Sequence, residues 1–105
     1  MSKALKRLDA FLANFEKDGI AYTLIWYDDI DEIYRELRKE GIGRKDGKLI
    51  RLVKDLRDNW KKVKKEFTKL YEKLIDKDID PDKYLPNSLE KSAWKLYHYF
   101  MDKYD

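Results

Sequence analysis

The chain has 105 residues, of which 43% are hydrophobic and 43% charged, and its formal net charge is +3. This length suits one hydrophobic core, so we expect a single domain over residues 1–105. The absence of cysteine excludes disulfides, thiolate metal ligands and cysteine nucleophiles. No apolar run is long enough for a transmembrane helix or a signal peptide, and we therefore expect a cytoplasmic protein without a membrane partner.

The N-terminal segment predicts an amphipathic helix that begins after Ser2, a suitable N-cap, and runs to about Lys17. Its apolar residues recur at helical spacing and are Leu5, Leu8, Leu12 and Phe15. Asp18 and Gly19 follow, and we expect Gly19 to end the helix in a left-handed conformation.

Residues 20–27, with the sequence IAYTLIWY, are ambiguous because a short apolar run suits a buried strand or a buried helix. β-Propensity favours a strand, but no other segment offers a partner strand, and an isolated strand is not stable. We therefore expect the start of a second helix, which ends at Gly41. If that helix begins late, Asp29 and Glu32 form a capping-box-like start. The neighbouring acidic residues, Asp28, Asp29, Asp31 and Glu32, complement its dipole.

Residues 48–77 predict the longest helix, about 45 Å in length, without an internal proline or glycine. The apolar stripe consists of Leu49, Leu52, Leu56, Trp60, Val63, Phe67, Leu70 and Leu74. Residues 41–47 are expected to form a loop before it. Beyond Pro81 and Pro86, Asn87 and Glu90 predict a capping box for a last helix. The fold class is therefore all-α, a compact bundle of about four helices with the long helix at its centre.

Basic residues are concentrated in residues 44–73, which carry a net charge of +7. Lysines at four-residue steps form a ridge along the long helix, and such a ridge can contact successive phosphates, although a solvated helix face has the same composition. We expect a small non-enzymatic binding module that binds nucleic acid through this face. The candidate contacts are Arg44, Lys45, Lys54, Lys61, Lys65, Lys69 and Lys73.

Aromatic residues are the second signal, with eight tyrosines and three tryptophans. We expect the tryptophans Trp26, Trp60 and Trp94 to fill the core in part. Tyrosines suited to stacking unpaired bases beside the basic helix are Tyr22, Tyr27, Tyr84 and Tyr97.

The four rings of residues 97–100 cannot all face the core of one helix, so the C-terminal helix predicts an exposed aromatic patch. An alternative function is a protein–protein interaction module that uses Trp94, Tyr97 and Tyr99. Such a module could be an inhibitor or immunity-type protein of mobile-element or viral origin. An engineered helical bundle without a natural function is a further alternative.

Motifs for catalysis and metal binding are missing. His98 is the only histidine, and it has no sequence neighbour that would make it a general base or a metal ligand. The acidic residues of 76–82 alternate as in a calcium loop, but Pro81 and Asn87 occupy the positions where an EF-hand needs Gly and Glu. We expect no catalytic residue, metal or cofactor, and either a monomer or a homodimer. The absence of Gln and Cys beside many charged residues is a tendency of thermostable proteins.

Overall fold

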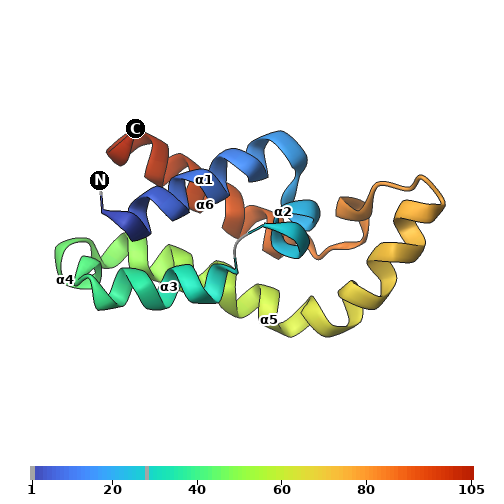
Figure 1. Cartoon of the computed structure of the whole chain (residues 1–105), viewed down its shortest axis with the longest axis horizontal. Helices are drawn as coiled ribbons and strands as arrows, with labels where there is room; N and C mark the ends of the chain where they lie inside the picture. The colour runs from blue at the N-terminus through green and yellow to red at the C-terminus, as the bar shows by residue number, and fades with distance from the viewer. Residues whose placement is uncertain (1, 28) are drawn as a thin grey trace.

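The computed structural model describes residues 2–27 and 29–105, and within them it is all-α, with helices and no strand (Figure 1). The elements are α1 (Lys3–Asp18), α2 (Ile20–Trp26), α3 (Ile30–Lys39), α4 (Ile42–Lys45), α5 (Gly47–Asp76), the 3-10 helix η1 (Pro81–Tyr84) and α6 (Asn87–Tyr104). The predicted fold class and the long central helix are confirmed. The longest dimension of the molecule, 44 Å, matches the length of α5.

The ends of α1 are set by Ser2 and Gly19. The Ser2 hydroxyl accepts a hydrogen bond from the Leu5 N–H at 3.2 Å, as the sequence predicts. Gly19 ends the helix with a φ of 89°, which favours glycine, but its ψ of 164° lies outside the left-handed helical region. The chain therefore turns sharply into α2 instead of completing a left-handed cap.

Residues 20–26 are helical, so the choice of helix over strand is confirmed. The second helix expected up to Gly41 is instead two helices, because the chain becomes extended at Tyr27 and Asp29. Asp29 caps α3 by accepting a hydrogen bond from the Asp31 N–H at 2.9 Å. Asp28, part of the predicted acidic start, lies outside the described residues.

Two local predictions are wrong. Residues 41–47 include the four-residue helix α4, which begins after Gly41 and buries Ile42. In α6, Asn87 is the first helical residue and Pro86 is the N-cap, without a side-chain hydrogen bond. Proline suits this end of a helix because its fixed φ is compatible with a helix start.

The apolar stripe of α5 turns around the helix more than the sequence pattern predicts. Its buried residues are Leu49, Val53, Leu56, Trp60, Phe67, Tyr71 and Leu74. Leu52 and Val63 are only half-buried, and Leu70 is 36% exposed. The N-terminal half of α5 packs against α3 and α6, whereas its C-terminal half meets η1 and the Trp26 side chain. The partners of α5 thus change along its length, which explains why Val53 and Tyr71 are buried in place of predicted residues.

Candidate functional site

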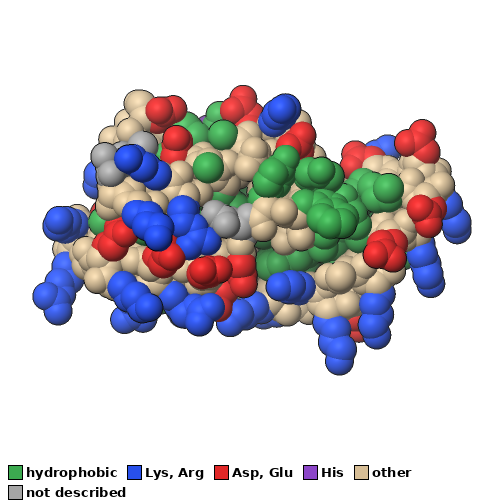
Figure 2. Space-filling view, viewed as in Figure 1, with side chains coloured by type: hydrophobic (Ala, Val, Ile, Leu, Met, Phe, Trp, Pro, Cys, Tyr) green, Lys and Arg blue, Asp and Glu red, His purple; other side chains and the backbone are tan. Residues whose placement is uncertain are grey.

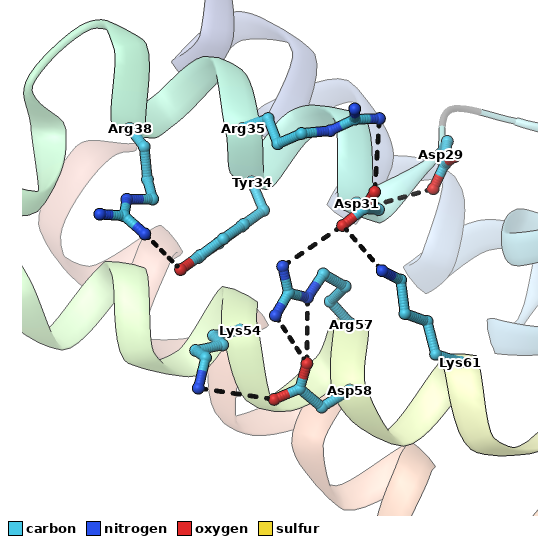
Figure 3. A network of polar contacts seen from close by, with 9 residues as sticks. All are labelled: Asp29, Asp31, Tyr34, Arg35, Arg38, Lys54, Arg57, Asp58 and Lys61. Carbon is cyan, nitrogen blue, oxygen red and sulfur yellow. Dashed lines mark hydrogen bonds and ion pairs between the residues drawn. The ribbon is translucent and has the colours of Figure 1, made fainter.

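The N-terminal part of the basic face of α5 is partly neutralised by acidic side chains (Figure 3). Lys61 lies 3.4 Å from Asp31 of α3, and Lys54 lies 3.8 Å from Asp58 on its own helix. Arg57 contacts both acids, at 3.3 Å from Asp31 and 2.8 Å from Asp58. Two of the predicted phosphate contacts, Lys54 and Lys61, therefore already have carboxylate partners within the chain.

Asp31 is the centre of this network. Burial alone would raise its pKa, but the hydrogen bond from Lys61 and the positive charges of Lys61, Arg35 and Arg57 outweigh it, and the pKa is lowered. The Arg57 guanidinium also lies over the Tyr34 ring, 4.3 Å from its centroid. The Arg57 side chain is mostly buried, and its contacts with Asp31 and Tyr34 join α5 to α3. The network therefore stabilises the packing of these two helices.

The C-terminal half of α5 is different. Five exposed lysines there form no ion pair with any residue that the structure describes. These residues, called here the unpaired lysines, are Lys62, Lys64, Lys65, Lys69 and Lys73. Because four residues exceed one helical turn, the line of Lys65, Lys69 and Lys73 shifts by about 40° around the helix at each step. The unpaired lysines thus cover a broad strip of one half-helix.

Arg44 and Lys45 lie apart from these lysines. Both are exposed on α4, at the opposite end of α5 from the unpaired lysines (Figure 1). The stretch of α5 from Gly47 to Lys65 alone corresponds to about 27 Å. The structure therefore does not bring all seven predicted contacts into one site.

An exposed group of apolar side chains lies over α2 and the C-terminal half of α5 (Figure 2). Trp26 is 61% exposed, so the expectation that it fills the core is wrong. Its ring lies 6.4 Å from those of Tyr22 and Tyr71, and its indole N–H donates to the Tyr71 hydroxyl at 3.1 Å. This group, called here the Trp26 cluster, consists of Tyr22, Trp26, Tyr27, Tyr71 and Ile75.

The exposure of Trp26 follows from the shortness of α2. This helix buries Ile20, Ala21, Thr23 and Leu24, which leaves Tyr22 and Trp26 on the opposite face. Helical spacing within residues 20–26 is the sequence signal for this exposure. This signal is weak on the sequence alone because a short, mostly apolar segment suits a strand as well as a helix.

Of the unpaired lysines, Lys64 shares a face of α5 with the Trp26 cluster. Lys64, Thr68, Tyr71 and Ile75 follow one another at steps of three or four residues, which places them in one row along the helix. The cluster borders a surface hollow of about 480 Å³, which Glu72 and Asp76 also line. The exposed rings thus have Lys64 on their N-terminal side along α5 and the carboxylates of Glu72 and Asp76 at the hollow itself.

The three residues proposed for a protein partner do not form one patch. Trp94 packs on Phe15 with ring centroids 4.6 Å apart, and the Tyr97 hydroxyl donates to Glu16 of α1 at 2.6 Å. Tyr99 faces α5 instead, where its hydroxyl donates to Asp46 at 2.6 Å. All three are half-buried, and His98 is the exposed member of the C-terminal aromatic run.

Nothing in the sequence indicates a role for Asp46. In the structure its carboxylate is surrounded by hydrogen-bond donors. It is 5% exposed and accepts hydrogen bonds from Tyr99, Tyr104 and the Leu49 N–H, with the Lys103 ammonium 3.1 Å away. Burial would raise its pKa, but these donors outweigh that effect and lower the pKa to about 2. Burial and the Asp46 carboxylate raise the pKa of Tyr104 to about 12. This site caps α5 and ties it to α6.

Among the described residues, no three His, Asp or Glu side chains gather closely enough to hold a metal ion. No helix of that part of the chain has the length and apolar character needed to cross a membrane. A comparison with protein-family models, curated proteins and solved structures found no match to this chain. Function must therefore be argued from the surface itself.

Proposed function

We propose that this protein binds nucleic acid by contacting phosphates with the C-terminal half of α5. The observation that supports this proposal is the set of five unpaired lysines, which have no carboxylate partner in the described chain. Paired lysines such as Lys54 and Lys61 would have to give up a carboxylate before they could neutralise a phosphate. Unpaired lysines release only the counterions on the nucleic acid, so binding is favourable at low salt.

The regular helix supplies a fixed spacing for these charges. Lysines at four-residue steps lie about 6 Å apart along the helix axis, and the backbone of α5 is held by its buried stripe. Lysine contacts a phosphate as a point charge and carries no base preference. We therefore expect binding that is independent of sequence and strongly dependent on salt.

A protein partner is the second candidate. It is favoured by a shallow hollow of about 410 Å³ on α6 that is lined by Trp94, His98 and neighbouring polar side chains. Tryptophan is enriched among the residues that dominate protein interfaces. This hollow is lined by α6 and not by α5, so substitutions in the two surfaces separate the two functions.

The test compares two triple variants with equal loss of charge. One replaces Lys65, Lys69 and Lys73 by Gln, and the other replaces the exposed Lys17, Lys39 and Lys91 by Gln. Fluorescence anisotropy with labelled oligonucleotides, single- and double-stranded, gives the dissociation constant at several salt concentrations. The parent and the control variant should bind with a steep salt dependence.

If all three α5 lysines contact phosphates, the slope of log K against log salt on single strands should become shallower by about 2 in the α5 variant. The control variant should keep a slope close to that of the parent. Failure of the parent to bind any oligonucleotide at low salt would contradict the proposal. Equal binding by the two triple variants would also contradict it, and the hollow on α6 would then be the first surface to examine.

A further inference from the structure

The Trp26 cluster exposes aromatic and aliphatic surface to solvent. Trp26 is 61% exposed, and Tyr22, Tyr27 and Ile75 are exposed beside it. Ring contacts continue from Tyr22 through Trp26 and Tyr71 to Phe67 in the core. The exposed rings are therefore held in place by buried ones, and they form a preorganised surface.

The charges around the cluster indicate what it binds. Lys64 lies two helical turns before Tyr71 in the same row of α5, and Lys65 follows about 100° further around the helix. A partner that places an apolar flat group on the rings beside Tyr71 and a negative group about 10 Å away along α5, near Lys64, matches this arrangement. Unpaired bases and the phosphates of the same strand have this combination of groups.

We propose that the nucleic acid is single-stranded and that the Trp26 cluster stacks its unpaired bases. This inference rests on the proposed function, because it assigns the strand type and a second set of contacts to the same surface. Trp26 and Tyr22 provide the stacking faces, while Lys64 and Lys65 hold the backbone. A duplex keeps its bases stacked on one another, so it can use the lysines but not the exposed rings.

The carboxylates define the path of the strand. Glu72 and Asp76 line the same hollow and repel phosphates. We therefore expect the backbone to pass Lys64 and Lys65, which lie N-terminal to the hollow along α5, while the bases reach Trp26. Neutralising Glu72 removes this repulsion, so Glu72→Gln should tighten binding of a single strand.

The experiment measures binding of three probes of equal length: oligothymidylate, the same sugar–phosphate strand without bases, and a duplex. The protein is the full chain as parent, Trp26→Ala, Trp26→Phe and His98→Ala. His98 is the control because it is an exposed ring on α6 and is not part of the cluster. Circular dichroism and urea unfolding establish that each variant is folded.

Trp26→Ala should weaken binding of oligothymidylate about five- to 150-fold, the range seen for loss of one stacked base. It should leave binding of the strand without bases unchanged. Trp26→Phe keeps a ring and should retain most of the affinity, and His98→Ala should bind as the parent does. Oligothymidylate should also quench tryptophan fluorescence in the parent and not in Trp26→Phe, because Trp60 is 2% exposed and Trp94 is half-buried.

The outcomes separate this inference from the proposed function. Equal affinity for oligothymidylate and the strand without bases, or a preference for the duplex, would overturn base stacking and leave phosphate binding intact. Undiminished quenching in Trp26→Phe would also overturn it. No binding of any probe at low salt would contradict both.

Discussion

The ammonium of Lys61 on α5 lies 3.4 Å from the carboxylate of Asp31 on α3. Arg57 and Arg35 approach the same carboxylate at 3.3 Å each, so Asp31 has three cationic neighbours (Figure 3). This contact marks the boundary between two parts of the basic face of α5. The lysines up to Lys61 include ones that pair with carboxylates of the chain, whereas those after it on the helix have no such partner among the described residues. Lys61 lies at the boundary, and Lys65, four residues on, lies beyond it.

Lys61 and Lys65 should consequently differ in their effect on binding. We expect Lys65→Ala to make the salt dependence on single strands shallower by about 0.7 in slope, which is the value for one phosphate contact. Lys61→Ala should leave the slope close to that of the parent, because Asp31 compensates its charge. Anisotropy titrations at several salt concentrations measure both slopes.

The stability of the two variants provides the control. The Lys61 side chain is 57% exposed, so loss of its ion pair should change the free energy of unfolding by less than about 1 kcal/mol. A larger effect of Lys61→Ala than of Lys65→Ala on the salt slope would contradict the division of the basic face.

The lysine spacing on α5 could be predicted from the sequence, but the pairing could not. Helical periodicity places Lys54, Lys61 and Lys65 on one side of the helix without knowledge of the fold. The neutralisation of Lys61 depends on Asp31, which is thirty residues away in the sequence and belongs to another helix. Only the packing of α3 on α5 brings these two residues together.

Asp46 should make the stability of the protein depend on pH in acid. Its pKa falls from an ordinary 3.8 to about 2 in the folded chain, since donors from α6 outweigh burial. The unfolded chain therefore binds more protons between these two values. The contribution of Asp46 is fully present above about pH 4 and is lost as the pH falls through about 2, and it amounts to about 2 kcal/mol.

Asp46→Asn tests this contribution because asparagine still caps a helix but carries no charge. We expect it to lower the free energy of unfolding by about 2–3 kcal/mol at pH 7. It should also reduce the loss of stability between pH 4 and pH 2. Urea unfolding at these pH values gives both quantities, and Asp55→Asn, an exposed position on the same helix, is the control. If both variants lost stability equally in acid, the hydrogen bonds to Asp46 would not have this role.

Gly19 should be intolerant of a side chain. It has a φ of 89°, and an added Cβ would collide with the carboxylate of Asp82. That carboxylate accepts a hydrogen bond from the Ala21 N–H at 2.9 Å and so holds the start of α2. We expect Gly19→Ala to lower the free energy of unfolding by about 1–3 kcal/mol, the usual size of backbone strain.

Gly47→Ala is the matched comparison, since a Cβ there would meet no atom within 4 Å and its φ is not positive. It should stabilise the protein by about 0.4–1 kcal/mol by restricting the unfolded chain. Urea unfolding of the two variants under one condition measures the difference. Equal stability of the two would contradict the close approach of Asp82 to Gly19.

Trp26 shows why the candidate site was only partly predictable. Residue type alone predicts base stacking by Tyr22 and Tyr27, whereas it places Trp26 in part in the core. The turn at Gly19 and the break after Trp26 limit α2 to seven residues and leave the Trp26 ring outside. The extended backbone at Tyr27 and the cap at Asp29 mark that break, and their effect on so short a helix appears only in the structure.

Trp26 and Trp60 should therefore differ strongly in their contribution to stability. Trp60 is 2% exposed in the middle of α5, and Trp60→Ala should cost about 3–5 kcal/mol because it leaves a cavity. Trp26→Ala removes one hydrogen bond to Tyr71 and partial ring contacts, so it should cost no more than about 1–2 kcal/mol. Urea unfolding followed by circular dichroism measures both. A cost for Trp26→Ala as large as that for Trp60→Ala would assign Trp26 to the fold, whereas a small cost with the loss of single-strand binding would assign it to function.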